Sequence, residues 1–324
     1  MALDPQIAAM VASAPPFPPL ETIPIEVLRS SLREATVKRP AVDVDLARVD
    51  DRHVPGPAGP LAVRIYTPRG TGPFPIVVYF HGGGFAVGDL DTQDVIPRSM
   101  AGGSDSVVMS VDYRLAPEHK FPAAPDDAWA AVQWAAANAE ALQGDPTRIA
   151  VAGDSAGGIL AAGVAIRARD AGGPHVAAQI NWYGPGDHPL PHSGSTREYG
   201  DGPMLRLQDV DYFWNLYIAD KAHYADYRAN PARAADHRGL PPAFIGTAEC
   251  DLARDETEAY GHKLKTAGVE VEIHRYAGMT HGFMTLIGAV PSARQSMEDA
   301  CAFLRRQFAK PDARSAKLQE QSEI

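Results

Sequence analysis

Short apolar runs alternate with longer segments of mixed polarity along most of this sequence of 324 residues. Continuous apolar runs are typical of strands buried on both faces of a sheet, and they lie at 76–80, 107–111 and 149–152. Further strands are predicted at 177–182 and 243–247, and alternating polarity predicts strands at 48–54, 61–66 and 269–276. Helices are predicted at 126–137, 158–171 and 291–308. Strands that alternate with helices predict an α/β fold, in which helices flank a mostly parallel sheet.

Two segments do not follow this alternation. Residues 1–40 predict one or two helices around a proline-rich break at 15–19. Residues 185–230 begin with Gly, Pro and His and continue into the aromatic run Tyr-Phe-Trp-Asn-Leu-Tyr at 212–217. The second segment fits either a surface excursion with one buried helix or a lid over a binding site, and the pattern alone leaves both interpretations open.

Composition narrows the class of protein. Hydrophobic residues make up 45% of the chain, the ordinary share for a globular protein with a large core. The net charge of −10 argues against binding to nucleic acid, which usually requires a basic surface. Cys250 and Cys301 are too few for a disulfide framework, and no apolar run approaches the ~18 residues of a membrane span. The short apolar stretch 7–14 lacks the positive flank of a signal peptide, so we expect a cytoplasmic protein.

The pentapeptide Gly153-Asp154-Ser155-Ala156-Gly157 has the pattern G-x-S-x-G. It follows the apolar run 149–152 and precedes a segment rich in Ala, Ile and Leu, so it is predicted to form a sharp strand-to-helix turn. Glycines leave room for a strained backbone, and the helix N-terminus favours developing negative charge. The bare pattern also arises by chance, but this context predicts that Ser155 is a nucleophile.

A second motif, His81-Gly82-Gly83-Gly84-Phe85, follows the apolar run 76–80. Consecutive glycines are entropically unfavourable to order, and a flexible turn or a phosphate-binding loop would be the ordinary explanation. No Lys-Ser or Lys-Thr pair follows, and the spacing is not G-x-G-x-x-G, which argues against a nucleotide. Bare backbone N–H groups that converge on an oxyanion explain the loop better.

These two motifs, with Asp112-Tyr113-Arg114-Leu115-Ala116-Pro117-Glu118 between them, resemble the hormone-sensitive-lipase-like (bacterial family IV) carboxylesterases of the α/β-hydrolase superfamily. The resemblance runs from about residue 61 to 308 and fits the subtype with Asp before the nucleophile. It implies a mostly parallel sheet of the eight-stranded type with a helical cap. The implied core is 46–185 and 231–310, the implied cap is 1–45 and 186–230, and 311–324 is a polar tail.

The base and the acid of a catalytic triad follow from position and from the resemblance. In this fold the order along the chain is Ser, acid, His. His281 lies in the loop after the predicted strand that ends at Tyr276, at the carboxyl edge of the sheet, and its His-Gly-Phe context matches the family. The family pattern Asp-Pro-Leu-x-Asp-Glu selects Asp251 as the acid, although Leu252 stands where proline is usual. Asp255 is expected to begin the next helix.

The oxyanion hole is expected to combine the N–H of Ala156 with those of Gly83 and Gly84, as the family implies. His81 is expected to anchor the glycine loop rather than to act as a second base. Asp154 is expected to be buried and to tie neighbouring loops together. The residues expected at the substrate pocket are Phe85, Asp154, Leu205 and Phe213, and the resemblance implies no metal and no organic cofactor.

The predicted function is a serine carboxylesterase that hydrolyses short- to medium-chain esters through an acyl-enzyme. One alternative is a catalytically inactive receptor for a small ligand on the same scaffold, like the gibberellin receptor, which lacks the catalytic histidine. The other alternative is an amidase that uses the same triad. The expected partner is a small-molecule ester, with no nucleic acid. A homodimer through the sheet edge near 269–276 is implied by the family.

Overall fold

The computed structural model describes residues 2–14, 18–184, 186–191 and 193–310. Residues 15–17 of the predicted proline-rich break and the predicted tail at 311–324 therefore lie outside the described residues. Within the described ranges the centre of the molecule is an eight-stranded sheet with the order β1-β2-β4-β3-β5-β6-β7-β8. Its strands are β1 (Leu46–Gly56), β2 (Gly59–Pro68), β3 (Phe74–Phe80), β4 (Val107–Val111), β5 (Gly144–Asp154), β6 (Ala178–Trp182), β7 (Ala243–Cys250) and β8 (Val271–Thr280).

The sheet is mostly parallel, as the sequence predicts. Strand β1 pairs antiparallel with β2, and β2 pairs antiparallel with β4. All pairings from β4 through β3 and β5 to β8 are parallel. Parallel strands end at the same edge of a sheet, so the loops that follow β3, β5, β7 and β8 gather at one edge.

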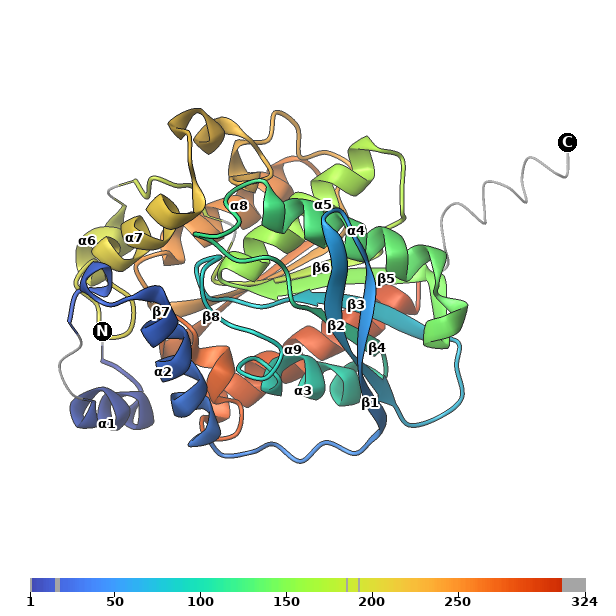
Figure 1. The fold of residues 1–324 in the computed structure, drawn as a ribbon, viewed down its shortest axis with the longest axis horizontal. Coiled ribbons are helices and arrows are strands. Elements are labelled where there is room, and N and C mark those ends of the chain that lie inside the picture. The colour runs from blue at the N-terminus through green and yellow to red at the C-terminus, as the bar shows by residue number, and fades with distance from the viewer. Residues whose placement is uncertain (1, 15–17, 185, 192, 311–324) are drawn as a thin grey trace, which may run out of the picture.

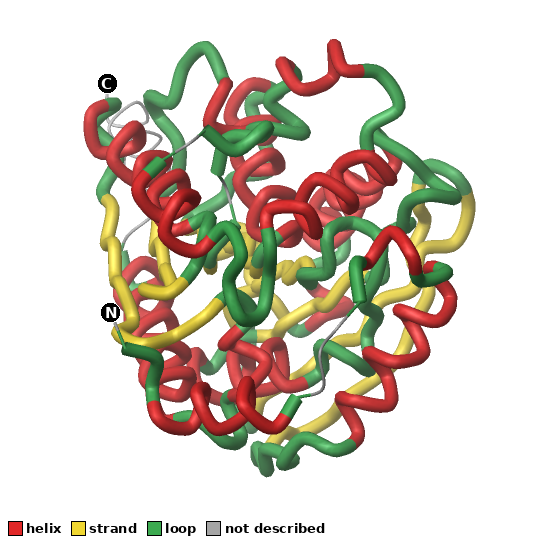
Figure 2. The backbone as a smooth tube through the Cα atoms, turned by 90° about the vertical axis from the view of Figure 1, so that its left-hand side faces the viewer, coloured by secondary structure: helices red, strands yellow, loops and turns green. Residues whose placement is uncertain are grey.

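Helices cover both faces of the sheet. The described helices are α1 (Pro5–Ser13), α2 (Ile25–Val37), α3 (Val95–Ser104), α4 (Ala123–Ala137), α5 (Ala156–Asp170), α6 (Gly194–Tyr199), α7 (Leu207–Tyr217), α8 (Arg254–Thr266) and α9 (Pro291–Phe308). Helices α4, α5 and α8 lie on the upper face in Figure 1, and α3 and α9 lie on the lower face. Figure 2 shows the same layers from the side, with helices above and below the strands.

Helix α3 is an element that the apolar pattern did not predict. Its sequence contains Pro97, Gly102 and Gly103, which are poor helix formers. A Cβ atom at Gly103 would lie 2.8 Å from Sγ of Cys301 on α9. The glycine therefore permits close packing between α3 and α9, and this tertiary contact outweighs the weak local propensity.

The two segments outside the strand–helix alternation lie together. Figure 1 shows α1 and α2, in blue, beside α6 and α7, in yellow, at the left end of the molecule. Leu20 and Leu28 pack with Val87, and Tyr212 and Phe213 of α7 pack against this cluster. Residues almost 200 positions apart in the chain thus share one small apolar cluster next to the loop that follows β3.

Candidate active site

Ser155 occupies a tight turn between β5 and α5. Its backbone has φ 51° and ψ −122°, a conformation that a residue with a Cβ rarely adopts. A Cβ atom at Gly153 would collide with the backbone of Gly157, and one at Gly157 would collide with the carbonyl of Phe80. The two glycines of the motif are therefore needed so that the turn can close against β3.

Three strand ends bring the predicted triad residues into contact. Ser155 follows β5, Asp251 follows β7, and His281 follows β8 directly, because β8 extends to Thr280. Nε2 of His281 lies 2.8 Å from Oγ of Ser155, and Nδ1 of His281 lies 2.8 Å from Oδ2 of Asp251. With the proton on Nδ1, the imidazole donates to Asp251 and accepts from the serine hydroxyl, the arrangement that activates a serine.

The electrostatic environment of His281 favours its protonated form. Burial lowers the pKa of His281, but the charge of Asp251 and its hydrogen bond raise it more, so the net pKa is raised. Asp251 is 2% exposed, and its other oxygen accepts from the N–H of Ala253 at 3.0 Å. The imidazole is thus held beside an oriented carboxylate that would stabilise an imidazolium.

The neighbouring carboxylate, Asp255, makes different contacts. Its Oδ2 accepts from the N–H of Ser195 at 2.8 Å, and its Oδ1 pairs with Arg254 at 2.9 Å. It lies in the first turn of α8, as the sequence predicts, where negative charge suits the helix dipole. Asp251, and not Asp255, contacts the imidazole of His281.

The glycine loop after β3 lies beside Ser155 along one cavity. Gly83 and Gly84 have φ values of 123° and 58°, and Phe85 has φ 61°. A Cβ atom at Gly84 would collide with the ring of Phe213, so this loop is pressed against α7. The cavity lining includes Gly83, Gly84, Ser155 and Ala156, the residues predicted to form the oxyanion hole and the nucleophile.

Asp154 joins the nucleophile turn to the glycine loop. It is 3% exposed, and its Oδ1 accepts from the hydroxyl of Tyr79 at 2.6 Å and from the N–H of Gly82 at 2.8 Å. Burial raises the pKa of Asp154, an effect that these hydrogen bonds oppose. The carboxylate is therefore engaged by protein groups at the base of the cavity.

The other residues expected at the substrate pocket, Phe85, Leu205 and Phe213, also line the cavity. Phe85 is 1% exposed, and its ring stacks on Tyr217 of α7 with centroids 3.8 Å apart. Most of the Phe85 side chain thus supports α7. Leu205 and Phe213 belong to the segment around α7 and contribute apolar surface above the nucleophile.

His81 anchors the glycine loop from inside. It is fully buried, its Nδ1 lies 2.7 Å from the carbonyl of Gly82, and its ring stacks on Tyr113 with centroids 4.4 Å apart. Burial lowers the pKa of His81 to about 4, so the ring is neutral at physiological pH. The hydroxyl of Tyr113 donates to the carbonyl of His81 at 2.8 Å, which ties the motif at 112–118 to the same loop.

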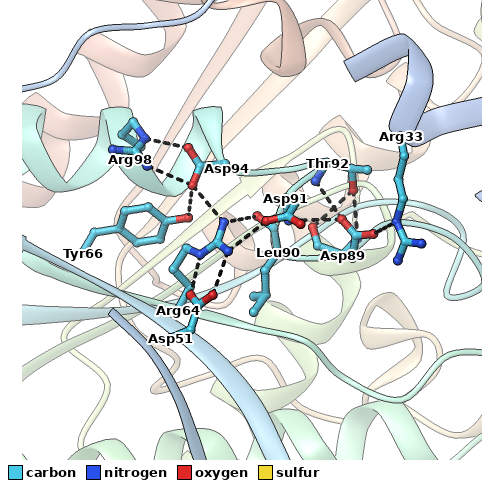
Figure 3. Close-up of polar contacts among 10 residues, drawn as sticks. All are labelled: Arg33, Asp51, Arg64, Tyr66, Asp89, Leu90, Asp91, Thr92, Asp94 and Arg98. Atoms are coloured by element: carbon cyan, nitrogen blue, oxygen red, sulfur yellow. Dashed lines mark hydrogen bonds and ion pairs between the residues drawn. The ribbon is translucent and has the colours of Figure 1, made fainter. Parts of the chain in front are cut away.

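A network of charged side chains fixes the chain just beyond the glycine loop. Figure 3 shows Asp89 between Arg33 of α2 and the backbone of Thr92. Asp89 accepts from Nε of Arg33 at 2.6 Å and from the N–H of Thr92 at 2.7 Å. Arg64 of β2 pairs with Asp91 at 2.8 Å and with Asp94 at 3.3 Å. The loop at 89–94 is thus tied both to α2 and to the sheet.

A functional position that the sequence analysis missed is Arg29 of α2. Its Nε donates to the carbonyl of Ala86 at 2.9 Å, and its Nη2 donates to the carbonyl of Ala116 at 3.0 Å. It also forms two hydrogen bonds with Glu118, at 2.8 Å and 2.9 Å. Arg29 thereby clamps the glycine loop to the motif at 112–118. The available signal in the sequence was Glu118, a charged residue in a motif that carried the family resemblance, because such a carboxylate calls for a cationic partner.

The cavity beside Ser155 has a volume of about 540 Å³. Its apolar lining comes from α2, α5 and the segment around α7, and it includes Leu32, Ile159, Leu205, Val210, Phe213 and Trp214. Among the described residues, no group of His, Cys, Asp and Glu side chains is arranged to hold a metal ion. No helix in the described ranges is long and apolar enough to cross a membrane.

A parallel sheet with a serine turn after β5 and a histidine after β8 defines the α/β-hydrolase class. A family model described as "alpha/beta hydrolase fold" matches residues 77–285. The chain therefore belongs to the α/β-hydrolase family, in its hormone-sensitive-lipase-like branch.

Named relatives and solved structures agree with this placement. The chain is 43% identical over 311 residues to Esterase LipI of Mycobacterium tuberculosis, a match that covers 94% of this chain and 95% of that protein. An esterase structure from Pyrobaculum calidifontis has a TM-score of 0.89 at 37% identity and covers 95% of this chain and 100% of that one. A thermostable esterase from Pseudomonas putida ECU1011 has a TM-score of 0.91 at 32% identity, with 96% and 99% covered.

Proposed function

We propose that this protein is a serine carboxylesterase that hydrolyses short- to medium-chain esters through an acyl-enzyme. The observation that carries the proposal is the pair of 2.8 Å contacts that link Ser155, His281 and Asp251 beside the glycine loop. The names of the relatives, which include esterases and carboxylesterases, support the same reaction.

In the proposed mechanism Oγ of Ser155 attacks the ester carbonyl while Nε2 of His281 takes the hydroxyl proton. The N–H groups of Gly83, Gly84 and Ala156 donate to the oxyanion of the tetrahedral intermediate. His281 then gives its proton to the leaving alcohol, which leaves an acyl-serine. A water molecule, deprotonated by His281, attacks this acyl group and releases the acid. Asp251 orients the imidazole and stabilises its charge without taking the proton.

We further propose that residues 1–45 and 186–230 form a cap over a core made of 46–185 and 231–310. The apolar cluster of Leu20 and Leu28 with Tyr212 and Phe213 beside it supports this division. So does the hydrogen bond from Arg206 to the carbonyl of Pro18, at 3.3 Å, which joins the two segments. A cap would exclude water from the acyl chain and thereby favour substrates that fill the apolar part of the cavity.

The size and chemistry of the cavity support short to medium acyl chains. Its volume of about 540 Å³ lies within the ~300–1,000 Å³ of ordinary small-molecule sites. The residues that we propose to contact substrate are Leu205 and Phe213, with Phe85 and Asp154 supporting the walls.

The test is hydrolysis of p-nitrophenyl acetate, butyrate and octanoate beside the p-nitroanilide of butyric acid. We expect ester hydrolysis with a preference for the shorter chains and little anilide cleavage. An enzyme with equal rates on the anilide would be an amidase, and binding of the esters without turnover would indicate a receptor.

Replacement of the nucleophile gives the first specific prediction. Ser155→Ala removes one oxygen at a turn whose backbone does not depend on it, so we expect an unchanged circular dichroism spectrum and loss of ester turnover. The mutant should retain less than ~1% of the wild-type rate, because the nucleophile and its base act as a unit. A rate of more than a few per cent would show that another residue is the nucleophile.

Two further expectations concern the whole protein. We propose a homodimer through β8, which forms one edge of the sheet, where an unpaired strand can add a partner strand. Light scattering that gives a monomer mass at micromolar concentration would contradict it. We also propose a cytoplasmic location, supported by two buried free cysteines, Cys250 and Cys301.

A further inference from the structure

Two basic side chains line the cavity beside the nucleophile. Lys38 and Arg39 line it at the end of α2, and neither forms an ion pair with a carboxylate among the described residues. The acidic residues of the lining are already engaged. Asp154 is held by the hydrogen bonds given above, and Asp187 pairs with Arg233 at 2.5 Å. Neither carboxylate therefore forms an ion pair with Lys38 or Arg39 among the described residues.

Of the two cations, Arg39 is the one whose surroundings point to a ligand. Its Nη1 atom is buried and has no hydrogen-bond partner among the residues that the structure describes. The other arginines of the α2 segment differ, because hydrogen bonds to Glu118 and Asp89 raise the pKa of Arg29 and Arg33, whereas burial lowers the pKa of Arg39. A guanidinium keeps its proton in proteins, so Arg39 is a charge that is partly removed from water and lacks a counterion.

Gln93 lines the same cavity and is also incompletely satisfied. It is 5% exposed, and its Oε1 atom is buried without a hydrogen-bond partner in the described part of the chain. Its backbone N–H donates to the carbonyl of Asp89 at 3.3 Å. An amide also has two N–H donors, so Gln93 can donate hydrogen bonds in a part of the cavity that is otherwise largely apolar.

A purely structural role explains only part of these observations. A cation just beyond the last turn of a helix interacts favourably with the helix dipole, which accounts for a positive residue near the end of α2. It does not account for a partly buried guanidinium that lines the cavity with no carboxylate partner among the described residues, since a side chain on the outer surface would be hydrated there. An anionic ligand in the cavity would pair with Arg39 and accept from the amide N–H groups of Gln93, whereas the Oε1 atom of Gln93 needs a donor instead.

We infer that Arg39, assisted by Gln93, binds a carboxylate of the substrate, so that the natural substrates are esters that carry a second, anionic group. Arginine suits this role because its planar fork binds a carboxylate through two parallel hydrogen bonds. Half-esters of dicarboxylic acids and O-acyl hydroxy acids have this chemistry. The inference rests on the proposed esterase function, whose reaction at Ser155 it leaves unchanged.

The experiment compares charged esters with their neutral amide isosteres. Monoethyl glutarate and ethyl 4-carbamoylbutanoate test a carboxylate on the acyl side, and 4-acetoxybutanoate and 4-acetoxybutanamide test one on the alcohol side. Arg39→Gln should lower kcat/KM for the charged member of at least one pair by about 10- to 100-fold, as expected for a lost hydrogen bond to a charged group. It should change the value for the neutral members by less than about 2-fold, a shift within the range of surface effects.

Matched variants distinguish loss of carboxylate binding from misfolding and from a change in the overall electrostatic potential of the protein. Arg39→Lys keeps the charge and should restore part of the preference. Arg238→Gln removes an arginine whose side chain is 80% exposed and should leave the preference unchanged. An equal loss on charged and neutral esters in Arg39→Gln would overturn the inference, as would no rescue by lysine or an equal effect of Arg238→Gln. Turnover of neutral esters by the wild type keeps the proposed function intact in each of these cases, whereas no ester turnover at all would refute it.

Discussion

At the scale of single residues, the site depends on one imidazole and the two oxygens that it contacts. His281 bridges Ser155 and Asp251 through its two ring nitrogens, so its tautomer and its charge both matter. Strand ends place these three residues, and the glycines around Ser155 allow its strained backbone. Changes at the acid should therefore act through the histidine and not through the fold.

The acid can be tested against its neighbour. Asp251→Asn presents a donor where the imidazole needs an acceptor, which favours the wrong tautomer, and we expect kcat to fall by roughly 10⁴-fold, as in serine proteases. Asp255→Asn is the matched control, because Asp255 contacts Ser195 and Arg254 instead of His281. Its effect on kcat should be less than about 10-fold, in keeping with a change outside the triad. Steady-state kinetics in which the two effects are reversed would identify Asp255 as the acid.

The carboxylate of Asp251 should also set the acid limb of the pH–rate profile, through its effect on the pKa of His281. Catalysis requires a neutral His281, so kcat/KM should fall as the pH drops through the pKa of that residue. Burial lowers this pKa and Asp251 raises it, with a raised net value. Removal of the negative charge in Asp251→Asn should therefore move the acid limb to lower pH, even as the maximal rate falls. A pH–rate profile whose acid limb stays in place in this variant would show that another group controls it.

At the scale of elements, α2 is fastened to the loops of the site by arginines on one helix. Arg29 reaches the backbone of both the glycine loop and the motif at 112–118, whereas Arg33 reaches Asp89 in the following loop. The side chain of Arg29 is 23% exposed and that of Arg33 is 64% exposed. Exposed ion pairs contribute little, so the two anchors should differ in importance.

Arg29→Met tests the stronger anchor. It keeps the length of the side chain but removes every donor to Ala86, Ala116 and Glu118. A loosened glycine loop misplaces the oxyanion donors, and we expect kcat/KM for p-nitrophenyl butyrate to fall roughly 10-fold or more. Arg33→Met, the control on the same helix, should cost less than about 3-fold, as for an exposed pair. Equal losses in both variants would mean that α2 acts only as a cover.

At the scale of the whole molecule, the charge network next to β2 and α2 also affects stability. Asp112 lies among the acidic groups of this region, and burial, followed by the charge of Asp89, raises the pKa of Asp112 to about 6. A carboxyl whose folded-state pKa is raised holds its proton more tightly when folded. Its contribution to stability is therefore present at low pH and lost as the pH rises through about 6.

Asp112→Asn should consequently stabilise the protein at neutral pH. Because the folded state then avoids a buried charge, we expect the free energy of unfolding at pH 7.5 to rise by about 1–2 kcal/mol. Near pH 4 the difference between mutant and wild type should disappear, since Asp112 is then protonated in the folded protein. Urea denaturation at both pH values measures this, and a destabilised mutant at pH 7.5 would show that the charge of Asp112 is needed.

The sequence by itself determined the parts of this protein that local pattern controls. Apolar runs predicted the strands, the glycines around Ser155 predicted a turn, and the rule that parallel strands end at one edge placed His281 there, whereas the family pattern selected Asp251. These inferences succeed because each depends on neighbours in the chain or on a general property of parallel sheets. The predicted roles in catalysis remain predictions that the variants above address.

Only the tertiary structure decided which distant groups meet. The partners of Arg29 lie 57 to 89 residues away, and Tyr79 and Gly82 lie more than 70 residues from their partner Asp154, so no local period signals these contacts. Helix α3 formed despite its glycines, because Gly103 allows close contact with Cys301 of α9. No sequence pattern singled out Arg39, because the burial of its Nη1 atom without a partner among the described residues depends on how the fold encloses the cavity. Burial and pairing depend on which segments pack together, so composition and periodicity do not predict them for an individual residue.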